Sequence, residues 1–183
     1  MKKLVLGAAM LLFAQFSFGQ AVTDQAVIPV SVTLNAILRL TVTSGGNIVF
    51  VVNTIQQYEE GIEATDQTKT KFRVSSSRNF TVTMVPENTT HFVGLETGNV
   101  ADFPITNVGY EMESGAGAVL PGDIIVLAAS NSLVSNNAVG DEEYSLAWHL
   151  ATPAVLGTDP NLLLQSIPAD IYVNNMFLTL APQ

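Results

Sequence analysis

Alternating apolar and polar residues begin soon after the N-terminus and recur along the chain. In residues 22–34 most apolar side chains fall on one face of an extended backbone, at Val22, Ala26, Ile28, Val30, Val32 and Leu34, while Val27 and Pro29 fall on the other. Only Asp24 interrupts this face, and alternation with a period of two predicts a half-buried strand. Pro29 has no backbone N–H to donate, so we expect this strand at a sheet edge or with a bulge.

The same signals predict further strands, separated by clusters of turn-forming residues. We expect strands at residues 37–43, 48–52, 72–76, 79–85, 91–95, 105–112, 123–129, 144–150 and 169–180. The continuous apolar run at 48–52 predicts a strand buried on both faces. Residues 53–61 are the one helical candidate, with Thr54 as its cap and Gly61 as its stop. Residues 130–141, rich in Asn, Ser and Gly, predict a loop.

Together these segments predict an all-β fold, an Ig-like or pilin-like antiparallel β-sandwich of about nine to ten strands with one short helix. We expect its core to contain residues 48–52, residues 124–127 and the face of residues 144–150 that carries Trp148. His149, on the opposite face of the same strand, is predicted to face solvent. No internal repeat divides the sequence, so residues 20–183 are predicted to form one domain.

The first 19 residues have the layout of a secretory signal peptide. Two lysines precede an apolar run over residues 4–16, and Ser17 and Gly19 place small residues at the −3 and −1 positions of a cleavage site before Gln20. The apolar run is too short for a permanent membrane span. We therefore predict a signal peptide at residues 1–19. The mature protein is expected to be exported, with no integral membrane span, to the cell surface, the extracellular space or the periplasm.

Composition and charge exclude some classes of partner. Once Lys2 and Lys3 are removed, five basic residues remain against sixteen acidic ones, a net charge of −11. Such a protein has little electrostatic attraction to nucleic acid or anionic lipid, so neither is an expected partner. Cys is absent, and a mature chain of 164 residues is long enough to form a hydrophobic core without disulfides.

No catalytic or metal-binding motif stands out, so we predict a non-enzymatic protein with no cofactor. His91 and His149 lie on different predicted strands without metal-ligand spacing. The acidic clusters at residues 59–66 and 141–143 have the oxygen ligands that Ca²⁺ prefers, but neither matches a D-x-D-x-D-G loop, and solvated surface is the simpler interpretation. The serines at 75–77 lack the G-x-S-x-G context of a nucleophile.

Two other functions stay open as alternatives. A carbohydrate-binding module is the first, because exposed aromatic side chains on a sandwich can stack on sugar rings. The mature chain has one Trp and four Tyr, and Trp148 lies on a regular apolar face, which favours a core position over a sugar platform. A secreted hydrolase with a carboxylate pair is the more distant alternative, because the separation of such a pair is set by the fold.

Four segments carry a resemblance to known proteins: VSVTLNAILRLTVT at residues 30–43, IVFVVNTIQQYEEGI at 48–62, FRVSSSRNFTVTM at 72–84 and the C-terminal FLTLAP. They resemble exported bacterial β-sandwiches related to spore-coat-U-type and fimbrial subunit domains. The resemblance implies a pilin-like sandwich with a structural or adhesive role at the bacterial surface, and it carries over no catalytic residue. The chain departs from disulfide-bearing fimbrial subunits because it has no Cys.

We therefore expect a secreted structural or adhesive cell-surface protein, such as a subunit of a fimbrium or another assembly. Its expected partners are other protein subunits, either copies of itself or members of a surface assembly, with glycans as a second class. The candidate assembly strand is the alternating face of Val22, Ala26, Ile28 and Val30, which a neighbour's open sheet edge could accept. The alternative is an ordinary first strand that continues to Leu34 within its own sandwich.

Overall fold

A computed structural model describes residues 26–96, 103–115, 118–119, 121–137, 139–157 and 161–183. The chain divides into two units, residues 1–34 and residues 35–183, which are described separately. The predicted signal peptide, its cleavage site and Val22 lie outside the described residues.

In the first unit, the described residues 26–34 form no strand. The larger apolar side chains of this segment are between 79% and 90% exposed: Val27, Ile28, Val30, Val32 and Leu34. The prediction of a half-buried strand is therefore wrong for residues 26–34. Alternation shows that a segment is suited to having one covered face, but it does not specify which surface covers that face.

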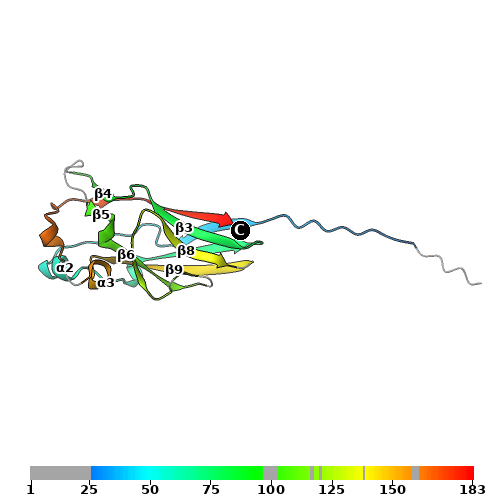
Figure 1. Cartoon of the computed structure of the whole chain (residues 1–183), viewed down its shortest axis with the longest axis horizontal. Coiled ribbons are helices and arrows are strands. Elements are labelled where there is room, and N and C mark those ends of the chain that lie inside the picture. The colour runs from blue at the N-terminus through cyan, green and yellow to red at the C-terminus, as the bar shows by residue number, and fades with distance from the viewer. Residues whose placement is uncertain (1–25, 97–102, 116–117, 120, 138, 158–160) are drawn as a thin grey trace, which may run out of the picture. The chain divides into compact units, whose positions relative to one another are not determined.

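Antiparallel pairing builds three sheets from the second unit (Figure 1). The five-stranded sheet has the order β1 (Leu38–Ser44), β2 (Lys69–Ser76), β9 (Gly140–Leu150), β6 (Val108–Ser114) and β7 (Ile124–Val126). A second sheet has the order β11 (Met176–Pro182), β3 (Phe80–Pro86) and β8 (Asn131–Asn137). A small third sheet has the order β10 (Tyr172–Val173), β4 (His91–Gly94) and β5 (Phe103–Pro104). All the pairs between these strands are antiparallel.

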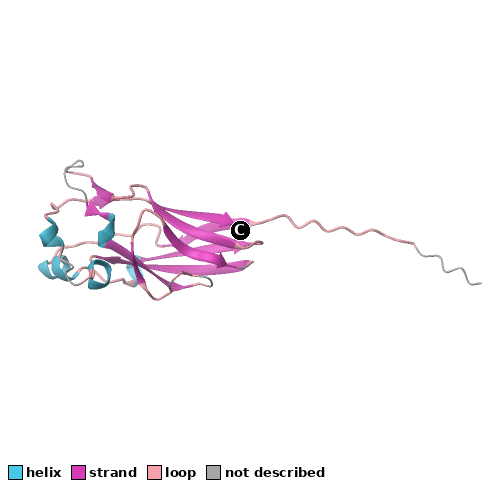
Figure 2. Cartoon of the chain, in the orientation of Figure 1, coloured by secondary structure: helices cyan, strands magenta, loops and turns pink. Residues whose placement is uncertain are grey.

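The helical segments are short: α2 (Ile55–Glu60), α3 (Pro153–Leu156) and the 3-10 turns Asp66–Thr68, Ile105–Asn107 and Leu162–Gln165. Figure 2 shows helical segments gathered at one end of the second unit and the C-terminus at the other. The predicted helix at 53–61 is confirmed, with a capping box between Thr54 and Gln57. Gly61 ends it at a φ of 76°, where a Cβ would lie 2.3 Å from the Leu150 carbonyl oxygen.

The core lies between the five-stranded sheet and the β11-β3-β8 sheet. Burial alternates along β3, whose inward side chains Phe80, Val82 and Met84 are fully buried. They belong to the same buried cluster as Phe72 and Tyr144 of the opposite sheet, whose rings stack with centroids 5.0 Å apart. The predicted all-β, sandwich-like fold is therefore confirmed, with eleven strands and two short α-helices among the described residues.

Several element predictions need correction. Residues 48–52 form no strand, and their side chains alternate between half-buried Ile48, Phe50 and Val52 and exposed Val49 and Val51. The prediction of a strand buried on both faces is therefore wrong, because this segment covers the core from one side only. In the predicted core at 124–127, Leu127 is fully buried and the three residues of β7 are half-buried.

The predicted loop at 130–141 is also wrong, because it contains β8 and the start of β9. Leu133 and Val134 of β8 are fully buried, and β8 pairs with β3. Asn and Ser have low strand propensity, so the local sequence of this segment predicts a loop. The strand forms because β8 pairs with β3.

Replacing a fully buried aromatic residue should destabilise the domain far more than replacing an exposed one. We expect Phe72→Ala to lower the free energy of unfolding by about 3–5 kcal/mol, because it leaves a cavity in the core. Phe177→Ala, a matched change at a half-exposed position on β11, should cost about 1 kcal/mol or less. Urea denaturation followed by circular dichroism measures both values, and equal losses would contradict the placement of the core.

Candidate functional site

Two edge strands lie near each other on one side of the sandwich. β1 and β11 each pair with a single neighbour among the described residues. Both are tied to the β2–β3 turn (residues 77–79): Ser77 N–H donates to Ile37 O at 2.9 Å, and Gln183 N–H donates to Asn79 O at 2.8 Å. β1 therefore begins and β11 ends at this turn, so the two strands run in opposite directions.

An apolar groove of about 560 Å³ lies between these two edges, and we call it the edge groove. β1 contributes Leu40 and Val42 to its lining, and β11 contributes Met176, Phe177 and Leu178. Core side chains also line it: Met84, Leu146 and Trp148. An edge strand presents a row of backbone N–H and C=O groups, so the site offers both apolar surface and hydrogen-bonding partners to a further strand.

A short chain of hydrogen bonds holds the turn after β1 against this groove. Trp148 Nε1–H donates to Thr70 Oγ1 at 3.0 Å, and Thr70 Oγ1–H donates to Gly45 O at 2.7 Å. A Cβ at Gly45, whose φ is 64°, would lie 1.8 Å from the Lys69 carbonyl oxygen, so only glycine fits there. The predicted core position of Trp148 is confirmed, and its buried ring is not an exposed platform for a sugar.

The candidate assembly strand falls partly on described residues. Ala26, Ile28 and Val30 lie in the extended segment 26–34, where they are exposed and take part in no strand. Val22 lies outside the described residues. In an extended conformation, Val32 and Leu34 lie on the same face as Ile28 and Val30. The apolar face therefore continues beyond the predicted assembly strand as far as Leu34. The edge groove itself has no signature in the sequence, because it depends on which strands have only one neighbour.

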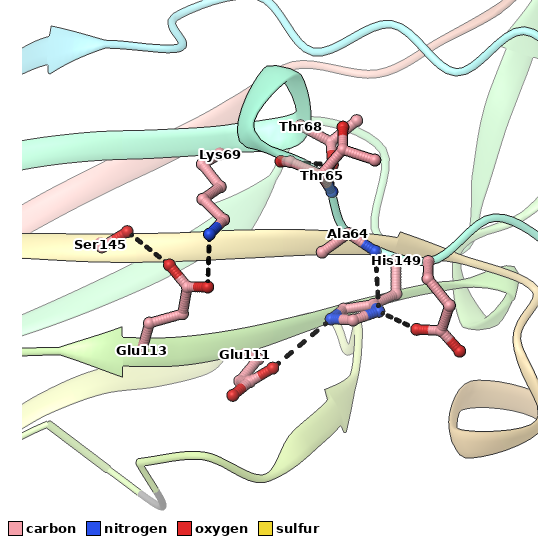
Figure 3. A network of polar contacts seen from close by, with 9 residues as sticks. Ala64, Thr65, Thr68, Lys69, Glu111, Glu113, Ser145 and His149 are labelled. Carbon is pink, nitrogen blue, oxygen red and sulfur yellow. Dashed lines mark hydrogen bonds and ion pairs between the residues drawn. The ribbon is translucent and has the colours of Figure 1, made fainter.

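His149 is buried, with 5% of its surface exposed, so the prediction that it faces solvent is wrong. Residues 61–65 cover this face of the sheet, because Ile62 pairs with Leu150. His149 Nδ1 lies 2.8 Å from Glu63 Oε2, and Ala64 N–H also points to Nδ1 at 3.3 Å (Figure 3). His149 Nε2 lies 3.6 Å from Glu111 Oε2 and has no hydrogen-bond partner.

A second polar group lies on the same sheet (Figure 3). Lys69 Nζ lies 2.8 Å from Glu113 Oε1 and 3.3 Å from Asp66 Oδ1, and Ser145 Oγ–H donates to Glu113 Oε2 at 2.9 Å. The hydrogen bond from Lys69 lowers the pKa of Glu113 from its ordinary value of 4.5. The same hydrogen bond raises the pKa of Lys69. Both contacts tie β2, β6 and β9 together across the sheet.

Members of the acidic clusters contact different partners. Glu63 faces His149 and Asp66 faces Lys69, while Asp141 Oδ2 lies 3.5 Å from Arg73 Nη1. The structure places no group of three or more His, Cys, Asp or Glu side chains so that it could hold a metal ion, within the residues it describes. His91, the other histidine, contacts Asn88 Nδ2 and Thr90 Oγ1, both at 2.8 Å.

Comparison of the sequence with protein-family models and with curated proteins finds no match. No helix within the described part of the chain is long and apolar enough to cross a membrane. The geometry of the edge groove and of residues 26–34 therefore carries the functional argument.

The ion pair of Glu113 should make stability depend on pH. Because the folded-state pKa of Glu113 is lowered, its contribution to stability is present above its ordinary pKa of 4.5 and is lost as the pH falls through the lower folded-state value. We expect Glu113→Gln to lower the melting temperature at pH 7 and to have little effect once the pH is well below 4.5. Glu143→Gln, an exposed change on β9, is the matched control and should leave the melting temperature at pH 7 unchanged. A Glu113→Gln effect that persists at acidic pH would contradict this account.

Proposed function

We propose that this protein is an exported, non-enzymatic structural subunit that assembles with copies of itself by strand donation. In this proposal, residues 26–34 of one copy occupy the edge groove of another copy. The observation that carries the proposal is that one chain has two complementary features. These are an exposed segment with alternating apolar residues and an apolar groove between two edge strands.

The dimensions of the two features match. Residues 28–34 form a seven-residue stretch, and β1 and β11 are each seven residues long. An inserted strand would pair its backbone with an open edge and direct Ile28, Val30, Val32 and Leu34 toward the groove. Burying an aliphatic side chain contributes about 1.5–3 kcal/mol, so four contribute about 6–12 kcal/mol before the costs of association.

Occupation by a second copy is favoured over folding back within one chain. To lie beside β1 of its own domain, the segment would need a tight hairpin at Asn35 and Ala36. Two-residue hairpin turns favour Asn-Gly, because both central residues adopt positive φ, and Ala36 is unsuited to that conformation. Ile37 is also held by Ser77 through both its N–H and its carbonyl oxygen, which restricts where such a turn could form.

The resemblance to spore-coat-U-type and fimbrial subunit domains supports the same class of function and a location at the cell surface. Export through the predicted signal peptide is part of the proposal. The alternative of a carbohydrate-binding module loses support because Trp148, its strongest aromatic candidate, is buried in the core.

Charge placed on the donated face should abolish assembly without unfolding the domain. We expect wild-type mature protein to form oligomers, and Ile28→Asp/Val30→Asp to remain monomeric with an unchanged melting temperature. Ser31→Asp/Thr33→Asp adds the same charge to the opposite face and should still assemble. Sedimentation velocity over a range of concentrations measures all three, and a wild type that stays strictly monomeric at high concentration would overturn the proposal.

The groove can be tested separately, because Trp148 is the one tryptophan of the chain and lines the groove. A synthetic peptide of residues 26–36 should bind the Ile28→Asp/Val30→Asp monomer and change its tryptophan emission in a saturable way. The same peptide with Ile28→Asp/Val30→Asp should produce no change. Equal responses to the two peptides would show that the groove does not select the apolar face.

A further inference from the structure

We propose that residues 48–52 are the backbone edge that receives residues 28–34 of another copy when that segment enters the edge groove. This inference rests on the proposed strand donation and adds to it the segment with which the donated strand pairs. Residues 48–52, which we call the acceptor edge, belong to no strand in the free protein and become one in the assembly.

The sequence of the acceptor edge suits a strand. Its residues are Ile, Val, Phe, Val and Val, all with high strand propensity. Every second side chain, starting with Ile48, is half-buried against the core, whereas Val49 is 64% exposed and Val51 63%. Burial with a period of two is the pattern of an extended backbone that has one face on a core.

The backbone of the acceptor edge lacks the neighbour that a strand requires. Within the described part of the chain, no N–H or C=O group of residues 46–52 forms a hydrogen bond with another protein group. By contrast, β1, which comes directly before, pairs with β2 from Leu38 to Ser44. Five successive strand-forming residues therefore present an open row of donors and acceptors, which is the template that an added strand uses.

The turn after β1 explains why β2 does not provide this neighbour. Gly45 has a φ of 64°, and its carbonyl oxygen accepts a hydrogen bond from Thr70 Oγ1–H at 2.7 Å. Thr70 Oγ1 in turn accepts from Trp148 Nε1–H at 3.0 Å, which fixes the turn. A positive φ interrupts an extended backbone, so the chain leaves the edge of β2 before the acceptor edge begins.

The acceptor edge borders the groove that the donated strand enters. Ile48 and Phe50 line the edge groove together with residues 45–47, and β1 contributes only Leu40 and Val42. The lining therefore continues past the end of β1. A seven-residue strand that fills the groove lies beside residues 48–50 as well as beside the second half of β1.

The donated segment carries the complementary pattern. Its apolar residues alternate with the same period as those of the acceptor edge, so its apolar face and the half-buried side chains of residues 48–52 meet on one face. Ser31 and Thr33 then lie on the outer face beside Val49 and Val51. Pro29 has no backbone N–H, and residues 30–34, which all have one, supply the ladder.

Amide hydrogen exchange, followed by NMR at single residues, measures this pairing directly. In the Ile28→Asp/Val30→Asp monomer, we expect the amides of residues 48–52 to exchange without protection. A saturating peptide of residues 26–36 should slow exchange of every second amide in this segment by about tenfold or more, because those N–H groups bond to the inserted strand. Contacts between α-protons of the peptide and of residues 48–52 should appear in the same sample. Amides that are already protected in the free monomer would contradict an open edge.

Disulfide formation gives an independent test, because the chain has no native Cys. Val49→Cys in the monomer is combined with a peptide of residues 26–36 that carries either Ser31→Cys or Thr33→Cys. We expect one of these peptides to cross-link about tenfold faster to Val49→Cys than to Val139→Cys, because pairing raises the effective concentration of the two thiols. Val139, between β8 and β9, is the matched control, with 63% exposure against 64% for Val49. Equal rates at the two positions would overturn the inference.

The two proposals fail in different ways. A peptide that changes neither the tryptophan emission nor the exchange of any amide would overturn strand donation and the acceptor edge together. A peptide that binds in the groove and protects amides of β11, while residues 48–52 stay unprotected, would overturn the acceptor edge alone and leave strand donation standing.

Discussion

The open side of this sandwich follows from the turn at residues 77–79, where the chain crosses from the five-stranded sheet to the β11-β3-β8 sheet. β2 and β3 flank the turn, and each has an edge strand as its outer neighbour, β1 and β11 respectively. Hydrogen bonds from the turn to Ile37 and Gln183 fix the start of one edge and the end of the other. Because both edges are tied to one turn, they lie on the same side and border the edge groove.

Part of the outer face of the five-stranded sheet is covered from within the chain. Residues 61–65 fold over β9, and Glu63 and Glu111 face the buried His149. Lys69, Glu113 and Ser145 join three neighbouring strands by an ion pair and a hydrogen bond. These contacts link neighbouring elements of the sheet, so they favour one arrangement of the strands. The edge groove is bordered by two strands with a single neighbour each, which makes its apolar lining the strongest candidate for a contact with another molecule.

Much of the fold could be predicted from local pattern. The strand pattern identified β1, β2, β3 and the central part of β9, and burial alternates with the pattern along β2 and β3. The helix at 53–61 was predictable from its cap and its terminal glycine, which act within a few residues. β8 was missed because Asn and Ser dominate its composition, while its pairing with β3 depends on a strand about fifty residues earlier in the chain. His149 was predicted to face solvent but is buried, because the segment that covers it is distant in the sequence.

For the candidate site, too, some properties follow from the sequence and others only from the tertiary structure. The sequence by itself determined that residues 26–34 carry an apolar face suited to an extended strand, because side chains alternate along any such backbone. It also determined the sandwich class, the acidic charge and the absence of Cys. Only the tertiary structure decided that residues 26–34 are exposed and that β1 and β11 border a common groove. It also decided that Trp148 lines this groove. These properties depend on which strands become neighbours, and strand neighbours are chosen by the packing of the whole core rather than by any local run of residues.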